Sequence, residues 1–256
     1  MIHKGAIVIL ALLGALFIGL SLGLLGSGGS ILTLPMLILV LGRPEQLAFA
    51  ESLAIVGVLA TVGSLPYAAA STIDWQSVFF FGLPGMVGAY GGAAASYLIS
   101  ATLHLKLFAL VMLIMAVMML LPHSRCEHAS SSAQPRWMNA LGGLLIGCLS
   151  GCMGIGGGSL IVSALVLYHH LPMPIAVGTS LVIIAMNASI GFAKHLMALH
   201  ALHQEVSGEV IVTVSAAGIA GSFLGALLSK VIPPLRLRQL FGLNALAMGL
   251  YILFAE

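Results

Sequence analysis

An uncharged apolar run near the amino terminus constrains the fold of this chain more than any other feature. No charged side chain occurs between Gly5 and Gly42. As one helix this run would be about 57 Å long, nearly twice the roughly 30 Å thickness of the hydrocarbon core of a bilayer. It therefore has to turn back, and the glycine cluster at residues 26–29 is where the backbone can do so. The second arm, residues 30–41, would be only about 18 Å long, which predicts that it starts inside the membrane.

The composition indicates a membrane protein. Hydrophobic residues make up 60% of the 256 residues and charged residues only 6%, and the mean hydropathy is +1.16. A soluble domain has no reason to carry so little charge, whereas a helical bundle surrounded by the lipid bilayer does. We therefore predict an all-α polytopic membrane protein. The formal net charge of +2 and the lack of a basic run give no argument for a nucleic-acid partner.

The first apolar run also looks like a secretory signal peptide, because Lys4 precedes it. The run continues far beyond the usual length of the apolar region of such a signal, and it lacks a convincing small-residue cleavage site. We therefore interpret it as a retained first transmembrane helix.

The second half of the chain repeats the first. A shift of 128 residues places one glycine cluster on another, and a shift of 133 residues relates the later parts of the two halves. The first shift relates Gly19, Gly23, Gly26, Gly28, Gly29, Ala48, Ser52, Leu53 and Gly63 to Gly147, Gly151, Gly154, Gly156, Gly157, Ala176, Ser180, Leu181 and Gly191, and the second relates Gly85, Gly88, Gly92, Phe108 and Met115 to Gly218, Gly221, Gly225, Phe241 and Met248. So many coincidences in register indicate a duplication.

We therefore predict a single membrane domain over residues 1–256, made of two homologous repeats. Repeat one spans residues 1–121 and repeat two residues 137–256, with a solvated linker at 122–136. Each repeat would hold a glycine-broken helical hairpin and three transmembrane helices, at about 45–66, 75–99 and 103–121 in the first. The repeats are inverted if each hairpin returns to its own side of the membrane, and parallel if it crosses. Broken helices favour inversion, whereas the basic residues do not decide the question.

The glycine hairpins predict a binding site for an anion. A helix that begins inside the membrane leaves its first N–H groups without intrahelical acceptors, and hydrocarbon offers none. Their partial positive charge favours an anion, and glycine permits the positive φ and close backbone approach that such a turn needs. No Lys or Arg occurs between Gly5 and Gly42 or between Trp137 and Ala193, so backbone dipoles and hydroxyls would hold the anion. The alternative is that the hairpins are merely tight packing turns.

The predicted substrate-binding residues belong to the two hairpins and to the polar positions on the segments that follow them. They are Gly26, Ser27, Gly28, Gly29, Ser30, Gly154, Ile155, Gly156, Gly157, Gly158, Ser159, Ser52, Thr179, Ser180 and Asn187. Two helix beginnings that meet near the membrane midplane would together form a cage for an oxyanion.

Three further residues are candidates for coupling or gating. Glu51 lies inside a predicted span, where an ionisable side chain is a functional hypothesis. Protonated, it could donate to an oxyanion, and ionised it would repel one; it could equally be an interfacial carboxylate that is paired with Arg43 or exposed to headgroups. Tyr67 and His195 occupy equivalent positions in the two repeats, where they could gate the site, relay protons or simply anchor their helices at the interface.

Two other motifs favour structural roles. The segments Gly88–Gly92 and Gly221–Gly225 present small-residue faces through which helices pack closely in lipid, and we expect them to clamp the broken segments. Asp74 before Trp75 is typical of a helix start with an aromatic residue at the membrane interface.

The cysteines and histidines do not form a recognisable reactive site. Cys148 and Cys152 are best interpreted as small packing residues, with a redox role as the alternative. His195, His200 and His203 have a poor spacing for a metal site. The sequence therefore predicts neither a metal nor another cofactor.

At these residues the chain resembles the TauE/SafE family of sulfite exporters. The resemblance rests on the paired hairpins, the segment Ala176–Leu181, the triplet at 73–75 and the glycine-rich third spans, and it covers nearly the whole chain. Two departures concern the substrate and the hairpin geometry: Ala50-Glu51-Ser52 stands where the family often has Gly-Thr-Ser, and Ser163 where it often has Pro. The resemblance implies a multi-pass carrier in the bacterial inner membrane. It would export sulfite, an organosulfonate such as sulfoacetate or a related small anion, driven by the membrane potential or a proton gradient.

We therefore predict a secondary transporter of a small oxyanion rather than an enzyme. One alternative is a cation or metal-ion permease that uses helix C-termini and Glu51, with the ion at the carbonyl groups before Gly26 and Gly154. A membrane enzyme would need a nucleophile and a base, for which Cys152 with a distant histidine is the only weak candidate. A scaffold protein would leave the paired helix breaks unexplained. A homodimer is plausible, although nothing in the sequence argues for it.

Overall fold

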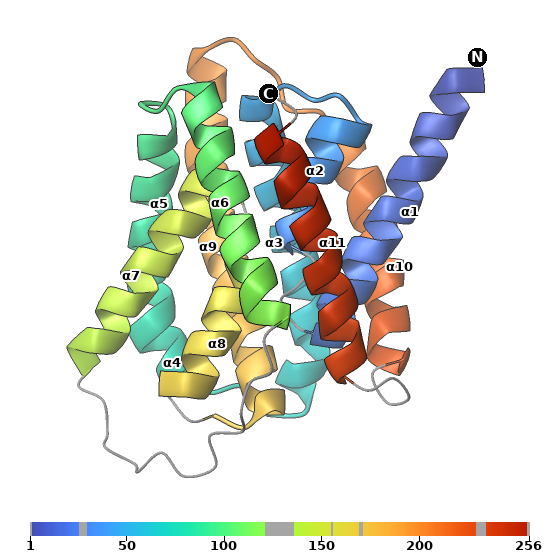
Figure 1. The fold of residues 1–256 in the computed structure, drawn as a ribbon. Coiled ribbons are helices and arrows are strands. Elements are labelled where there is room, and N and C mark those ends of the chain that lie inside the picture. Colours follow the sequence, from blue (N-terminus) through green and yellow to red (C-terminus); the bar gives the residue numbers. More distant parts are fainter. Residues whose placement is uncertain are drawn as a thin grey trace.

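The computed structural model describes residues 2–25, 30–120, 136–154, 156–168, 171–228 and 234–254. Within these ranges the regular secondary structure is entirely helical, which confirms the prediction of an all-α membrane protein. The helices lie roughly side by side in one bundle, and both chain termini are marked at the same end of it (Figure 1).

The first half of the chain contains a broken hairpin followed by three long helical segments. In order, these elements are α1 (Ile2–Leu25), α2 (Ser30–Pro35) continuing as the π-helical segment η1 (Met36–Val40), α3 (Glu45–Ala69), α4 (Trp75–Ser77) continuing through the π-helical segment η2 (Val78–Gly82) into α5 (Leu83–Ser96), and α6 (Ala101–Leu120). The second half has a similar order of elements: α7 (Arg136–Met153), α8 (Gly158–Tyr168), α9 (Met173–Ala201), α10 (Gly208–Leu228) and α11 (Pro234–Phe254).

Local sequence explains where these helices begin. Pro44 caps α3 with a ψ of 141° and Pro172 caps α9 with a ψ of 142°, so the fixed φ of proline starts both central helices in the same way. Asp74 caps α4, because its carboxylate accepts hydrogen bonds from the amides of Gln76 and Ser77 at 3.3 Å each. This confirms the predicted helix start before Trp75.

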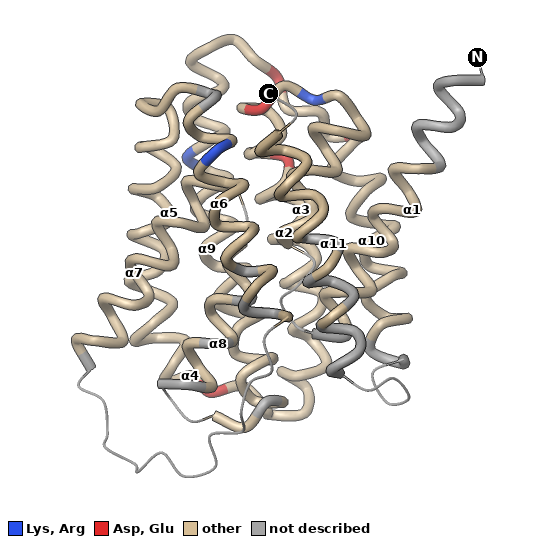
Figure 2. Tube along the Cα trace, viewed as in Figure 1, with Lys and Arg blue, Asp and Glu red and all other residues tan. Residues whose placement is uncertain are grey.

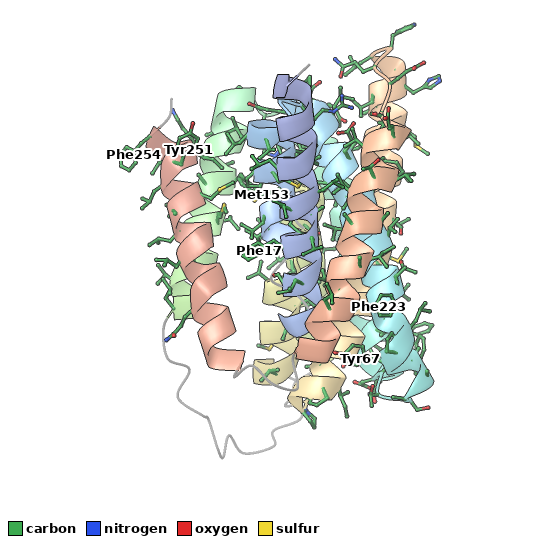
Figure 3. All side chains as sticks on the ribbon, turned by 90° about the vertical axis from the view of Figure 1, so that its right-hand side faces the viewer. Phe17, Tyr67, Met153, Phe223, Tyr251 and Phe254 are labelled. Atoms are coloured by element: carbon green, nitrogen blue, oxygen red, sulfur yellow. The ribbon has the colours of Figure 1, made fainter. Side chains whose placement is uncertain are left out.

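The outer surface of the bundle suits lipid. Among the described residues, four helices are long and apolar enough to cross a membrane: Glu45–Ala69, Trp75–Ser96, Pro174–Ala201 and Gly208–Gly225. Large apolar side chains point outward, including Phe223 and Phe254, which are 56% and 79% exposed (Figure 3). The described charged residues lie toward the two ends of the bundle and leave its middle uncharged (Figure 2).

Two helix pairs pack at backbone contact through glycines. On α5, a Cβ atom at Gly88 or Gly92 would overlap the backbone of Leu144 or Cys148 on α7. On α10, Gly221 and Gly225 stand against the backbone of α1 in the same way. This confirms that these small-residue faces let helices approach closely. Their partners, α1 and α7, are the first arms of the two hairpins, so the glycine faces hold the broken segments in place.

The two long helices α3 and α9 form the centre of the bundle. Leu53, Ile55 and Ile183 on these helices are fully buried, and Gly57 of α3 faces the side chain of Ala188 on α9. Helices α6 and α11 pack against each other, with Gly249 next to Leu113 (Figure 1). The short second arms of the hairpins and the clamping helices α5 and α10 all pack against the central pair α3 and α9.

The glycine clamp generates a test with a neighbouring residue as its control. Gly92→Ala places a methyl group on the backbone of Cys148, whereas Gly91 has no atom within 4 Å of a Cβ position and is exposed. Overpacking costs about 1–3 kcal/mol, so we expect Gly92→Ala to lower the thermal unfolding midpoint of the purified protein in detergent. Gly91→Ala should leave it unchanged or raise it slightly, since alanine favours a helix. Equal midpoints for the two variants would contradict the clamp.

Candidate functional site

The second hairpin breaks where the sequence predicts. Helix α7 ends at Met153 and α8 begins at Gly158. Between them Gly154, Gly156 and Gly157 have φ angles of +67°, +35° and +65°, which side chains other than glycine rarely adopt. The predicted positive φ is therefore confirmed here. The corresponding residues of the first hairpin, Gly26, Ser27, Gly28 and Gly29, lie outside the described residues, as does Ile155.

The second arms of the two hairpins begin beside each other inside the bundle. A Cβ atom on Gly156 would lie 3.5 Å from the Cβ of Ser30, the first residue of α2, and Ser30 is completely buried. The same position would lie 2.5 Å from Val56 of α3 and 3.1 Å from Ile184 of α9. The start of α2 and the approach to α8 thus meet between the two central helices.

The first amides of α8 lack intrahelical acceptors, and those of Gly157 and Gly158 form no backbone hydrogen bond with a described residue. The first helical hydrogen bond runs from the amide of Ile161 to the carbonyl of Gly157 at 3.0 Å. The side chain of Ser159 lies outside the described atoms.

The carbonyl end of α7 is, by contrast, bound by protein donors. The Nε2 atom of His195 lies 3.1 Å from the carbonyl oxygen of Gly151, and the Nε2 atom of His104 lies 2.7 Å from that of Cys152. A carbonyl only accepts, so both ring nitrogens donate. The hydroxyl of Ser52 donates to the carbonyl of Gly154 at 2.8 Å. These are the groups that a cation at this break would need.

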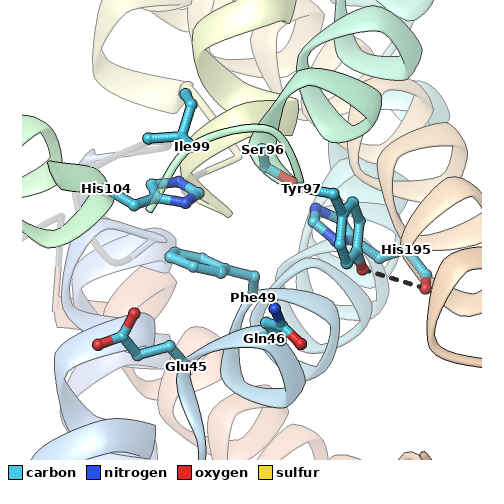
Figure 4. A pocket seen from close by; sticks show the side chains of 8 residues that line it. All are labelled: Glu45, Gln46, Phe49, Ser96, Tyr97, Ile99, His104 and His195. Carbon is cyan, nitrogen blue, oxygen red and sulfur yellow. Dashed lines mark hydrogen bonds between the residues drawn. The ribbon is translucent and has the colours of Figure 1, made fainter. Parts of the chain in front are cut away.

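A small cavity lies next to this capped end (Figure 4). It has a volume of about 30 Å³, enough for a water molecule. Phe49 forms part of its wall and stacks on His104 with a centroid separation of 4.2 Å. The Tyr97 hydroxyl lies 2.9 Å from Nδ1 of His195, so it can donate a hydrogen bond to that nitrogen while Nε2 donates to the carbonyl of Gly151. The same Phe49 ring lies against Gly154 of the hairpin.

His104 and Tyr97 were not among the candidates predicted from the sequence. Both belong to the junction between α5 and α6, and only the folded chain brings that junction to the end of α7. His195, predicted for gating, lies at the cavity. Its predicted counterpart Tyr67 lies near the opposite end of the bundle (Figure 3), with its side chain against Gly178.

Glu51 is fully buried, and its carboxylate is held on both oxygens. The Nε atom of Arg43 donates to Oε2 at 3.0 Å, Nη2 donates to Oε1, and the backbone amide of Ser207 donates to Oε1 at 3.1 Å. Of the two interfacial arrangements considered from the sequence, the structure shows the pairing of Glu51 with Arg43 rather than exposure to headgroups. The same hydrogen bond raises the pKa of the Arg43 guanidinium and keeps it charged.

The remaining predicted polar residues have different surroundings. Thr179, at the position equivalent to Glu51, accepts the amide hydrogen bond of Asp74 at 2.9 Å. Ser180 donates within its own helix to Val177 at 2.8 Å. Asn187 is completely buried against Gly85 of α5, and neither its oxygen nor its nitrogen has a partner among the described residues. The described residues contain no group of three or more His, Cys, Asp or Glu that could hold a metal ion.

The sequence of this chain is similar to those of several known membrane proteins. A probable membrane transporter protein from Xylella fastidiosa strain Temecula1 is 32% identical over 243 residues, which cover 93% of this chain and 91% of the relative. A probable membrane transporter protein from Methanocaldococcus jannaschii is 28% identical over 253 residues, covering 93% and 94%. The probable membrane transporter protein YunE of Bacillus subtilis is 28% identical over 221 residues, covering 75% and 79%. No solved structure matches this chain.

The family model described as sulfite exporter TauE/SafE matches residues 11–252. This range begins within α1 and ends within α11, so it includes both glycine clusters and every helix between them. The resemblance noted from the sequence is therefore confirmed, and the chain belongs to the TauE/SafE family of membrane transporters.

Proposed function

We propose that this transporter exports a small sulfur-containing oxyanion, such as sulfite or an organosulfonate, across a bacterial inner membrane. The anion would bind near the membrane midplane, where the two glycine-rich helix breaks meet. The observation that carries the proposal is the position of Gly156 beside Ser30, with the beginnings of two membrane-embedded helices next to each other. Helix beginnings present N–H groups and a positive dipole end, which favour anions.

The surroundings of the breaks support an anion over a cation. The carbonyl groups at the end of α7 already accept hydrogen bonds from His195, His104 and Ser52. The amides at the start of α8 face the break, and the described part of the bundle has no charged side chain across its middle. An anion held by neutral donors can also be released, as a transport cycle requires.

We further propose that the chain consists of two inverted repeats, which would give the transporter two equivalent orientations for alternating access. Contacts between the halves support this, because a contact between two residues recurs between their equivalents in the other repeat. Gly19 of α1 packs on Gly218 of α10. Gly147 and Gly85, which are related to these by the shifts of 128 and 133, also pack on each other. In Figure 1, α1 begins at the end where the termini are marked and α7 at the opposite end.

The proposed inversion predicts that two equivalent loops lie on opposite sides of the membrane. Gln76, just after the α3–α4 loop, and Gln204, in the α9–α10 loop, are both exposed. In a variant without the natural cysteines, we expect only one of Gln76→Cys and Gln204→Cys to react with a membrane-impermeant maleimide in intact cells. Permeabilised cells, in which both should react, are the control. Labelling of both positions from outside would support parallel repeats instead.

The proposed substrate class is tested by flux into proteoliposomes. We expect sulfite or sulfoacetate to enter at a rate well above that of empty liposomes, with sulfate as a comparison anion. Gly156→Ala should lower this rate about tenfold or more, because a Cβ there would lie 2.5 Å from Val56 at a φ of +35°. Gly91→Ala is the control. No flux of any of these anions by well-folded protein would refute the proposed function.

A role for Glu51 in proton coupling is tested by the pH dependence of the same flux. Sulfoacetate is the suitable substrate, because its charge does not change near neutral pH. If protonation of Glu51 releases Arg43 and the Ser207 amide, Glu51→Gln cannot ionise and should flatten the dependence of the rate on pH. The exposed Glu209→Gln is the matched control. An unchanged pH profile in Glu51→Gln would remove this residue from the coupling mechanism.

A further inference from the structure

Two buried polar side chains near the second hairpin have no partner in the described protein. The side chains of Ser150 on α7 and Asn187 on α9 are 1% and 0% exposed, and the Ser150 hydroxyl and both polar atoms of the Asn187 amide lack hydrogen bonds. Buried polar groups in native proteins are nearly always paired. An amide left unpaired in a bilayer-embedded interior is costly, because no water reaches it. Such groups call for a ligand.

Ser150 stands at the start of α8. A Cβ atom on Gly157 would lie 3.3 Å from the Cβ of Ser150 and 3.6 Å from its hydroxyl oxygen. The residue after Gly157 opens α8, an 11-residue helix whose first amides lack acceptors within the helix. The hydroxyl therefore adds a side-chain donor to the row of backbone donors.

Asn187 lies about one turn of α9 beyond Ile184, the residue that faces Gly156. Its amide oxygen and nitrogen are 2.9 and 3.0 Å from the Cβ position of Gly85 on α5. Gly85 in turn packs on Gly147 of α7, the helix that carries Ser150. Both unpaired side chains thus belong to the packed group of α5, α7 and α9, in which α7 is the first arm of the second hairpin.

The first half of the chain has leucines at the equivalent positions. The shift of 128 residues relates Ser150 to Leu22 and Asn187 to Leu59, and both leucines are 1% exposed. Leu59 packs on Gly218 just as Asn187 packs on Gly85. A leucine therefore fits this kind of position against glycine, and the packing of the helices does not require the polar side chains.

We infer that Ser150 and Asn187 donate hydrogen bonds to the transported anion, so that the second half supplies the side-chain donors of the site. This inference rests on the proposed function. One hydroxyl and one carboxamide offer three N–H or O–H donors to the oxygens of a sulfite or sulfonate group without adding charge. The first half presents Leu22 and Leu59 instead, and the site is asymmetric within a symmetric scaffold.

The inference is tested by Asn187→Leu and Ser150→Ala, each measured in two assays. The first is the concentration dependence of sulfite and sulfoacetate flux in proteoliposomes. We expect the KM to rise about tenfold in Asn187→Leu and severalfold in Ser150→Ala, with a smaller change in maximal rate. The second is the thermal midpoint in detergent with and without the anion, where both variants should lose the rise that the anion gives the wild type.

The midpoint without anion separates a ligand from a structural residue. Asn187→Leu removes an unpaired buried amide, so the ligand-free protein should unfold at a higher temperature than the wild type. A purely structural asparagine would give a lower midpoint. Asn187→Ala, which adds no volume, provides the same flux comparison should the leucine variant fail to fold.

Two serines serve as controls for the loss of a hydroxyl. Ser215 on α10 is also buried and has no partner among the described residues, and the exposed Ser189 on α9 donates to Ala185 at 2.7 Å. Neither Ser215→Ala nor Ser189→Ala should change the KM. This inference would be overturned by an unchanged KM in both the Asn187 and Ser150 variants, or by an equal rise in KM in the Ser215 variant. In either case, flux by the wild type would leave the proposed function standing. Absence of flux in the wild type would refute both.

Discussion

Inside a bilayer every backbone N–H and C=O group needs a partner, and the organisation of this protein follows from how a broken helix meets that demand. At the break between α7 and α8 the two kinds of group are treated differently. His195, His104 and Ser52 donate to the carbonyl side. The amide side has glycines with positive φ, and it adjoins the start of α2. The described carbonyl groups at the break are thus paired, whereas the amides of Gly157 and Gly158 form no backbone hydrogen bond with a described residue. This is the polarity that the proposed anion site would require.

Such a break has to be held firmly, because a short helix in the membrane has little stability of its own. The glycine faces of α5 and α10 provide this hold by bringing α7 and α1 to backbone contact. Close approach leaves no room for side-chain rearrangement between these pairs. We therefore expect a hairpin that moves relative to the rest of the bundle to carry its clamping helix with it.

The sequence predicted those parts of the structure that depend on local chemistry. The glycine break at 154–157, the Asp74 cap and the small-residue faces follow from the φ range of glycine, the short acceptor side chain of aspartate and the missing Cβ, and the structure confirms them. The predicted helices at about 45–66 and 103–121 correspond to α3 and α6 within a few residues. The π-helical segments η1 and η2 were not predicted, because no local motif in the sequence indicated them.

The parts that the sequence did not predict depend on contacts between distant segments. His104 and Tyr97 bear no motif and reach the end of α7 only through the fold. Ser52 was predicted to bind substrate, and the structure adds a hydrogen bond to Gly154 that no spacing rule implies. For Glu51 the sequence left open a coupling role and a pairing with Arg43. The structure shows that the pairing exists.

In the proposed inverted repeats, Glu51 makes the two ends of the bundle unequal. In two identical halves, the states open to either side would have equal free energy. Here the amide of Ser207 is bound by the Glu51 carboxylate with the support of Arg43, whereas the equivalent amide of Asp74 is bound by the neutral Thr179 hydroxyl. A hydrogen bond to a charged acceptor is roughly twice as strong as a neutral one. Under the proposed alternating access, the end of the bundle that holds Glu51 and Ser207 is therefore expected to be the harder one to open.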